Sequence, residues 1–478
     1  MEILKHNKMK NLIIAALALT AMLSACTSGG KQKETDKQEG EIMFTGAKNE
    51  VKLMTLDPGH FHAALVQKNM YEQVDPKVFM YAPEGPDVGD HMLKIEAFNN
   101  REVNPTSWET EVYSGPDYLE KMLEEKPGNV VVISGNNAKK TEYILSAVEA
   151  GINVLADKPM VITPDEFPML EEAFKKAEEN NVLLYDIMTE RYEITTLIQR
   201  ALSLKPEVFG SLQKGTPDKP AITKESVHHF FKYVAGSPLK RPPWFFDVTQ
   251  QGEGMVDVTT HLVDLIQWEA FPEVILDRED VEIINTRRWP TVLTPAMFEE
   301  VTKQKEFPPY LKDIEGGNLQ VFSNGEFVYK LKDIHAKVSV EWKYRAPEGA
   351  GDTHYSIMRG TQCDLIIKQG EEEGYKPQLY IEVNPEIDPD VFAGKLNDGV
   401  RELSSQYPGI NLEKLDGTTW KLHIPGKYKV GHERHFGQVT EKYLDFLVEQ
   451  KLPDWEVPNM IVKYYTTTEA MKAAMKKD

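Results

Sequence analysis

Short apolar runs alternate with helical segments along the first part of this chain. The runs occupy 51–56, 78–81, 130–133, 154–156 and 182–187. Helical stretches lie between them, and Gly151 suits the C-cap of the helix that precedes 154–156. Because strands separated by helices imply right-handed crossovers, this order predicts a Rossmann-like, doubly wound parallel sheet. Its ligand crevice is expected at the carboxyl ends of the strands.

After Gly210 the pattern changes to alternation with a period of two residues. Val338, Val340 and Trp342 alternate with polar residues, which predicts a strand with one wet face. Asn324-Gly325, between the apolar runs 319–322 and 327–331, is a strong signal for a two-residue hairpin turn. We therefore expect a second, α+β domain with an open, mainly antiparallel sheet.

These patterns predict five segments. They are a signal peptide at 1–25, a flexible tether at 26–49, a Rossmann-like dinucleotide-binding domain at 50–187, a substrate-binding and catalytic α+β domain at 188–385 and a mostly helical C-terminal extension at 386–478.

Composition excludes several classes of protein. With 478 residues, 41% of them hydrophobic, the chain can bury at least one large core. Acidic residues outnumber basic ones 75 to 55, which disfavours nucleic-acid partners because these need a concentrated basic face. The two cysteines exclude a disulfide framework and a four-thiolate zinc site.

The first 26 residues have the features of an export signal. Lysines precede an apolar run at 12–21 that is too short to span a bilayer. The run ends in Leu23-Ser24-Ala25-Cys26, which resembles the lipobox of bacterial lipoproteins. That resemblance implies lipidation at Cys26 and a mature protein that is exported and held at a membrane surface by its lipid anchor only. An ordinary cleaved signal peptide is the alternative.

The first strand-to-helix turn lacks the dinucleotide fingerprint. Three glycines normally allow a tight turn, close approach to the diphosphate and close helix packing, but only Gly59 is present here. Pro58 cannot donate an N–H, and Asp57 places negative charge near the expected diphosphate. A capping turn without a cofactor explains this loop equally well. Glu84, after the second run, is a candidate for ribose binding or a solvated loop residue.

Two later segments carry the stronger chemical signal. Asp157-Lys158-Pro159 follows a strand end, so the Lys158 ammonium is expected to point into the crevice. About a hundred residues later, Gly252-Glu253-Gly254 precedes Asp257 and His261, which share one face if they lie on a helix. By itself such a pair also fits a structural Asp–His hydrogen bond.

Together, in this order, the two segments resemble motifs of the Gfo/Idh/MocA family of nicotinamide-dependent sugar and polyol oxidoreductases. The resemblance runs from about Val51 to Val383, and Trp244 and Ala150-Gly151 also fit it. The C-terminal tail resembles the extension of exported Bacteroidetes members. Asp157 departs from the usual Glu, and Lys140 stands where many relatives have a histidine.

The resemblance implies a site and a reaction. His261 would be the base that takes a hydroxyl proton, Asp257 would orient it and Lys158 would stabilise the developing alkoxide. The expected cofactor-binding residues are Leu56, Asp57, Gly59, His60, Phe61, Glu84, Asn136, Asn137, Asp157 and Lys158. The expected substrate-binding residues are Lys158, His228, His229, Trp244, Asp257 and His261. No metal site is expected, because the histidines of Gly431-His432-Glu433-Arg434-His435 are three apart and no third ligand is in view.

The expected substrate is a small sugar or glycoside, oxidised at a secondary hydroxyl, C3 being the position that the resemblance suggests. Since no free nicotinamide pool exists outside the cytoplasm, NAD or NADP should be tightly held and recycled in place. The resemblance also allows a redox-neutral glycosidase that works through a 3-keto intermediate. A surface carbohydrate-binding protein that has lost its cofactor is a third alternative. A homo-oligomer is compatible with the exposed sheet face.

Overall fold

The computed structural model describes residues 44–234 and 237–477. The predicted signal peptide, Cys26 and most of the predicted tether lie outside the described residues. Phe44 is already buried in the core, so packing begins a few residues before the predicted end of the tether. None of the helices in the described ranges combines the length and apolar character needed to cross a membrane.

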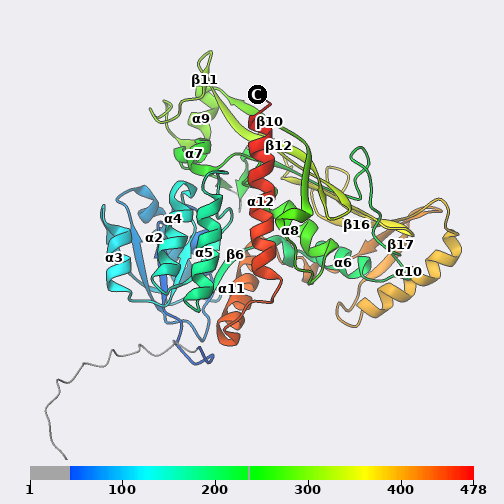
Figure 1. The fold of residues 1–478 in the computed structure, drawn as a ribbon, viewed down its shortest axis with the longest axis horizontal. Coiled ribbons are helices and arrows are strands. Elements are labelled where there is room, and N and C mark those ends of the chain that lie inside the picture. Colours follow the sequence, from blue (N-terminus) through cyan, green and yellow to red (C-terminus); the bar gives the residue numbers. More distant parts are fainter. Residues whose placement is uncertain (1–43, 235–236, 478) are drawn as a thin grey trace, which may run out of the picture. The chain divides into compact units, whose positions relative to one another are not determined.

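The first sheet is the predicted doubly wound sheet. Its six strands are all parallel, in the order β3-β2-β1-β4-β5-β6 (Figure 1). Every residue of β1, β4, β5 and β6 is buried, which explains why these strands read as continuous apolar runs. The strands are β1 (Leu53–Leu56), β2 (Lys77–Ala82), β3 (Glu109–Ser114), β4 (Val130–Ile133), β5 (Asn153–Asp157) and β6 (Leu184–Ile187).

The helices of this layer connect the parallel strands. α1 is short, with five residues. The helical elements are α1 (His62–Val66), α2 (Pro86–Asn100), α3 (Tyr118–Glu125), η1 (Asn137–Lys139), α4 (Lys140–Glu149), α5 (Phe167–Glu179) and η2 (Thr189–Tyr192).

The second sheet is large and mainly antiparallel, as predicted. Its order is β10-β12-β13-β7-β14-β15-β16-β18-β17, with β11 paired to β12, and only β13 and β7 pair in parallel. The strands are β7 (Ile222–Phe231), β10 (Val281–Leu293), β11 (Ile314–Glu315), β12 (Asn318–Leu331), β13 (Ile334–Arg345), β14 (Thr353–Arg359), β15 (Cys363–Gln369), β16 (Gln378–Val383), β17 (Asn411–Lys414) and β18 (Thr419–His423).

Helices and a small two-stranded ribbon complete this part of the chain. β8 (Tyr233–Val234) pairs with β9 (Ser237–Pro238). The helical elements are α6 (Ile194–Ser203), η3 (Pro243–Phe246), α7 (Val248–Gln251), α8 (Thr259–Ala270), η4 (Arg278–Asp280), α9 (Pro295–Thr302), α10 (Pro389–Leu403), η5 (Gly426–Tyr428), α11 (His432–Glu449) and α12 (Glu456–Met475).

The hairpin predicted at Asn324-Gly325 is wrong. Both residues lie inside β12, which continues through them. The Asn324 amide donates to the Trp289 and Thr291 oxygens and accepts from the Trp342 backbone N–H, so it links β12 to both neighbouring strands. Gly325 is required for another reason, because a Cβ there would lie 2.2 Å from the Met255 sulfur. The dipeptide therefore serves packing and strand linkage rather than a turn.

A buried ionic network joins β6 and η2 to α8 and α12. Arg191 binds Asp264 of α8 through two hydrogen bonds of 2.7 Å and also contacts Glu456 of α12. Lys463 of α12 contacts Asp264 and, at 2.6 Å, Asp186 of β6. Removing one partner of such a buried network typically costs about 3–5 kcal/mol. The network thus fixes α8 against the parallel sheet, with α12 lying alongside α8 and β10 (Figure 1).

Candidate active site

A cavity of about 510 Å³ lies where the carboxyl ends of β4 and β5 meet the second sheet. Lys158, Asp257 and His261 all line it. The Asp-Lys-Pro segment comes from the end of β5, whereas Asp257 lies in the turn before α8 and His261 in the first turn of that helix. The structure therefore brings together the three residues that the sequence predicts to be catalytic.

The pairing within this group differs from the expectation. The Lys158 ammonium donates to Asp257 Oδ1 at 2.6 Å, and both side chains are largely buried. Asp257 lies in the turn before α8, which begins only at Thr259. Among the described residues, no hydrogen bond joins Asp257 to His261. The carboxylate thus holds the ammonium, rather than orienting the imidazole as predicted.

His261 faces the cavity as a neutral imidazole. Burial, and then the nearby positive charge of Lys158, hold its pKa well below the ordinary value. Its Nδ1 is buried and has no hydrogen-bond partner in the described part of the chain. An imidazole in this state is unprotonated and free to accept a proton from a ligand in the cavity.

Lys140, the replacement for a histidine of many relatives, also lines the cavity. It is fully buried, and its ammonium donates to the Asp157 backbone carbonyl at 3.0 Å. Burial lowers its pKa to about 8. The chain therefore carries two amino groups at this end of β5, of which only Lys158 is paired with a carboxylate.

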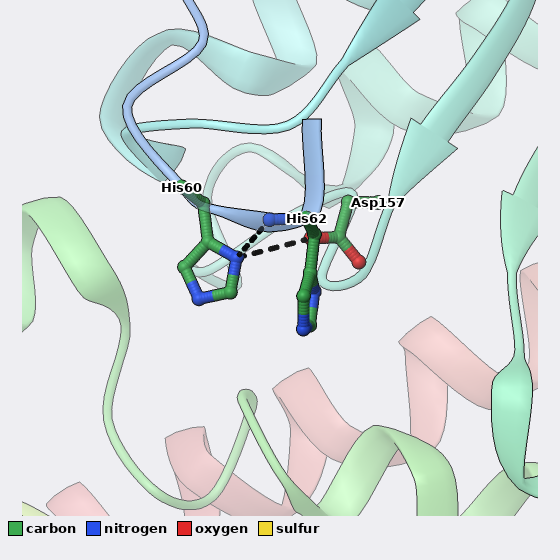
Figure 2. Close-up of side chains that lie close together, drawn as sticks. All are labelled: His60, His62 and Asp157. Atoms are coloured by element: carbon green, nitrogen blue, oxygen red, sulfur yellow. Dashed lines mark hydrogen bonds and ion pairs between the residues drawn. The ribbon is translucent and has the colours of Figure 1, made fainter. Parts of the chain in front are cut away.

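Histidines from distant parts of the chain gather beside Asp157. Figure 2 shows His60, from the loop after β1, and His62, the first residue of α1, beside the Asp157 carboxyl group. His62 Nδ1 lies 2.9 Å and His60 Nδ1 3.8 Å from Asp157 Oδ2. The other ring nitrogen of His62 lies 3.2 Å from His432 Nε2, so the C-terminal α11 reaches into the site. Sequence analysis assigned His60 to cofactor binding, gave His62 no role in the site and treated His432 only as part of a segment that lacks a third metal ligand.

The predicted substrate-binding residues divide into two groups. His228 lines the cavity and stacks on Trp342, with ring centroids 5.0 Å apart. An aromatic wall of this kind suits the apolar face of a sugar. His229 is buried against Asp352 instead, and Trp244 packs on the first loop, so neither lines the cavity.

The predicted cofactor-binding residues also divide. His60, Phe61, Asn137, Asp157 and Lys158 line the cavity. The remaining candidates do not line it: they are Leu56, which is buried at the end of β1, Asp57, Gly59, the exposed Glu84 and Asn136. The Asn136 side chain caps η1 and donates to Gln250, and Asn137 donates to the Gln251 carbonyl, so these amides bond to α7.

The space that a dinucleotide diphosphate needs above Gly59 is filled. A Cβ at Gly59 would lie 3.0 Å from the Asp87 carboxylate and 3.2 Å from the Trp244 ring. The Gly59 and His60 N–H groups already donate to the Asp57 and Ser134 carbonyls. Burial, opposed by a hydrogen bond from Tyr143 and reinforced by the Asp87 charge, raises the pKa of Asp57 to about 6. The residues therefore fit the nicotinamide end of a cofactor, and admit its diphosphate only if Trp244 and Asp87 move.

Sequence analysis missed several residues of the cavity. They are Glu190, Arg241, Asp352 and His432. Each comes from a segment without a recognisable motif, so only the folded chain shows that they converge. Burial and the neighbouring Glu193 raise the pKa of Glu190 to about 7.

Two protein families match this chain. Residues 198–475 match the family described as "Putative oxidoreductase C terminal domain", and residues 90–185 match the one described as "Oxidoreductase family, NAD-binding Rossmann fold". The second match begins after the first strand-to-helix turn, so it excludes the loop that carries Gly59. No curated protein sequence matches the chain.

Solved structures show the same fold. A protein of Parabacteroides merdae described as a "putative oxidoreductase" is 56% identical, with a TM-score of 0.90 over 91% of this chain and 100% of that one. A "putative oxidoreductase" of Thermotoga maritima is 14% identical, with a TM-score of 0.57 over 90% and 99%. A levoglucosan dehydrogenase in complex with NADH and levoglucosan is 11% identical, with a TM-score of 0.56 over 90% and 98%. The last two share the architecture of both domains.

Proposed function

This chain is a member of the Gfo/Idh/MocA family of oxidoreductases and carries the NAD-binding Rossmann fold, and we propose that it oxidises a secondary hydroxyl of a sugar or glycoside. One observation carries the proposal. Lys158, from the edge of the nucleotide-binding layer, and His261, from the neighbouring domain, line a single cavity that has an aromatic wall. The levoglucosan dehydrogenase of similar fold, bound to a sugar and NADH, supports a sugar as the substrate class.

In this proposal the chain's own groups handle the proton and the negative charge. Neutral His261 accepts the hydroxyl proton at a ring nitrogen, and the Lys158 ammonium stabilises the oxygen as it becomes negative. Asp257 keeps that ammonium in place. When bound, the nicotinamide supplies the hydride acceptor. His60, Phe61, Asn137 and Asp157 would surround its reactive end.

We further propose that the protein is exported and lipid-anchored at Cys26, on the strength of the N-terminal sequence. Export supports a cofactor that stays bound between turnovers, because a dissociated NAD would not be replaced. Oxidation at C3 of the sugar is the finer form of the proposal.

The test is to denature the purified full chain and measure the nicotinamide absorbance of the released cofactor. Glycosides are then screened for turnover, first with the wild type and then with His261→Ala. Loss of a general base typically costs about a hundredfold or more, so H261A should lose at least that much activity. His423→Ala, at an exposed site on β18, is the matched control and should retain activity. Activity of H261A within a few-fold of the wild type would refute the assignment of the base.

One observation favours a second function, the binding of carbohydrate without a cofactor. Asp87 and Trp244 occupy the diphosphate space, while the cavity and its aromatic wall are retained. If no cofactor is released and added NAD does not bind, this second function replaces the first. If a cofactor is present and the glycoside is cleaved with no net oxidation, the reaction is the redox-neutral one.

A further inference from the structure

We propose that His60, His62 and Asp157 bind one divalent transition-metal ion of the Zn²⁺ class. Their ligand atoms all lie within 4.8 Å of one another, on the wall of the cavity (Figure 2). Two imidazoles and one carboxylate form a donor set used for catalytic zinc and for non-haem iron. His60 and Asp157 also border the proposed nicotinamide position, so this inference is tested by measuring the ion itself and not by turnover.

The spacing of the atoms fits an ion bound at about 2.1 Å to each ligand. In a tetrahedral site of that size, neighbouring ligand atoms lie about 3.4 Å apart. The distances of His62 Nδ1 and His60 Nδ1 from Asp157 Oδ2 are 2.9 and 3.8 Å, on either side of that value. Small rotations of the two imidazole rings would therefore complete the site.

Ligation would replace hydrogen bonds within the cluster. His60 Nδ1 accepts the His62 backbone N–H at 3.3 Å, and because a ring nitrogen has one lone pair, His60 would give up this long contact to bind the ion. Asp157 Oδ2 lies 2.9 Å from His62 Nδ1 and accepts from the Ser134 hydroxyl at 2.9 Å. The carboxylate has further lone pairs, so it can bind the ion and keep Ser134 as an outer partner.

His62 has the outer partner expected of a metal ligand. Such a histidine normally donates its second ring N–H to a neighbouring acceptor. His62 Nε2 lies 3.2 Å from His432 Nε2, and His432 Nδ1 lies 3.8 Å from Glu190 Oε1. With the ion on Nδ1, neutral His62 would carry its one ring proton on Nε2 and donate it to His432 Nε2, and the ring proton of His432 would then lie on Nδ1, facing Glu190. The C-terminal helix α11 therefore supplies the residue that orients the ligand.

Neighbouring lysines do not compete for the carboxylate. The Lys158 ammonium is paired with Asp257, and Lys140 donates to the backbone carbonyl of Asp157 rather than to its side chain. A three-ligand site on a cavity wall leaves at least one coordination position open. That position would hold a water molecule, or a hydroxyl or carbonyl oxygen of a bound sugar.

The test measures metal directly. The full chain, purified without a polyhistidine tag or chelator, is analysed by inductively coupled plasma mass spectrometry. The chelator-treated protein is then titrated with Co²⁺, whose visible spectrum reports coordination by protein ligands. We expect one ion per chain and a saturable Co²⁺ spectrum. His60→Ala, His62→Ala and Asp157→Asn should each retain less than about a tenth of the ion, because each removes one of only three ligands.

Two variants separate ligation from other effects. His432→Ala should keep the ion but weaken its affinity by about 10- to 100-fold, as loss of an outer partner does. His423→Ala, on the exposed surface, should bind like the wild type. If a ligand variant unfolds, the melting temperature of the chelated wild type serves instead, since added Zn²⁺ should raise it. A wild type with no metal and no Co²⁺ spectrum would overturn the proposal, as would ligand variants that bind normally. Released nicotinamide is measured on the same preparations, so failure of either proposal is visible without the other.

Discussion

Replacement of Trp244 by alanine should strengthen the binding of NADH. The indole is 9% exposed and packs over Gly59, where a diphosphate would have to lie. A buried aromatic side chain covers about 150–250 Å², so exposing half of it uncovers roughly 100 Å². At about 25 cal/mol per Å² this costs about 2.5 kcal/mol, which weakens binding by about 60-fold. The W244A variant lacks the indole and avoids that cost, so its Kd for NADH should be several tens of times lower than that of the wild type.

The assay is isothermal titration calorimetry with NADH on cofactor-free protein. Trp268→Ala is the matched control, since this tryptophan lies on α8 under Arg200, away from the first loop. The control should bind NADH like the wild type. If folded W244A binds NADH with an affinity within threefold of the wild type, Trp244 is not the obstruction, and the argument from the filled space above Gly59 fails.

Three further outcomes follow from the contacts. Lys158→Met and Asp257→Asn should each lower the free energy of unfolding by about 2–4 kcal/mol, because the pair is buried and each single change leaves one charge without its partner. In a double-mutant cycle measured by urea unfolding, the double variant should lose less than the sum of the two single losses. Asp57→Asn should become more stabilising relative to the wild type as pH rises from 4.5 to 7.5. Folding raises the pKa of Asp57 from 3.8 to about 6, so above the higher value the ionised carboxylate costs the wild type about 3 kcal/mol of stability. A difference in unfolding free energy between variant and wild type that stays constant across pH would contradict this. Gly325→Ala should lose about 1–3 kcal/mol of stability in urea unfolding, because its Cβ would overlap the buried Met255 sulfur; a neutral effect would show that Met255 relocates freely.

The strands β1, β4, β5 and β6 were predictable because all of their residues are buried, whereas β3 was missed because its residues are exposed or half-buried. Val130–Ile133 reads the same in sequence and structure, since a strand covered on both sides needs apolar residues throughout. The turn signal at Asn324-Gly325 misled because local propensity does not record what lies across the sheet. At this position the Asn324 amide bonds to both neighbouring strands and Met255 packs against Gly325, and these contacts keep the backbone extended.

The cluster of His60, His62 and Asp157 could not be predicted, because its members are far apart in the chain. His62 and Asp157 are 95 residues apart, and His62 and His432 are 370 apart. No spacing rule covers such distances. His60 and His62 are two positions apart, but two histidines without a third ligand are weak evidence for a metal site. The third ligand, Asp157, belongs to the Asp-Lys-Pro segment, which the sequence analysis assigned to cofactor binding.

The role of Asp257 shows a different limit. Four-residue spacing places Asp257 and His261 on one face only if both lie within a helix, and α8 begins between them. Because Asp257 lies in the preceding turn, its carboxylate accepts a hydrogen bond from the Lys158 ammonium and does not contact the His261 imidazole. The sequence therefore predicted that these residues lie close together, whereas the partner of the carboxylate depended on where the helix starts.

The side chains that fill the space above Gly59 belong to a longer segment that packs against the parallel sheet. Trp244 lies in η3, and Gln250 and Gln251 of the adjoining α7 accept hydrogen bonds from Asn136 and Asn137 at the end of β4. Because η3 and α7 are consecutive, moving the indole away from the first loop strains both amide contacts. Entry of a cofactor would then oppose two hydrogen bonds as well as aromatic burial. A cofactor that had entered would leave only as fast as the closed form opens, which is the behaviour that the proposed retention of one nicotinamide would require.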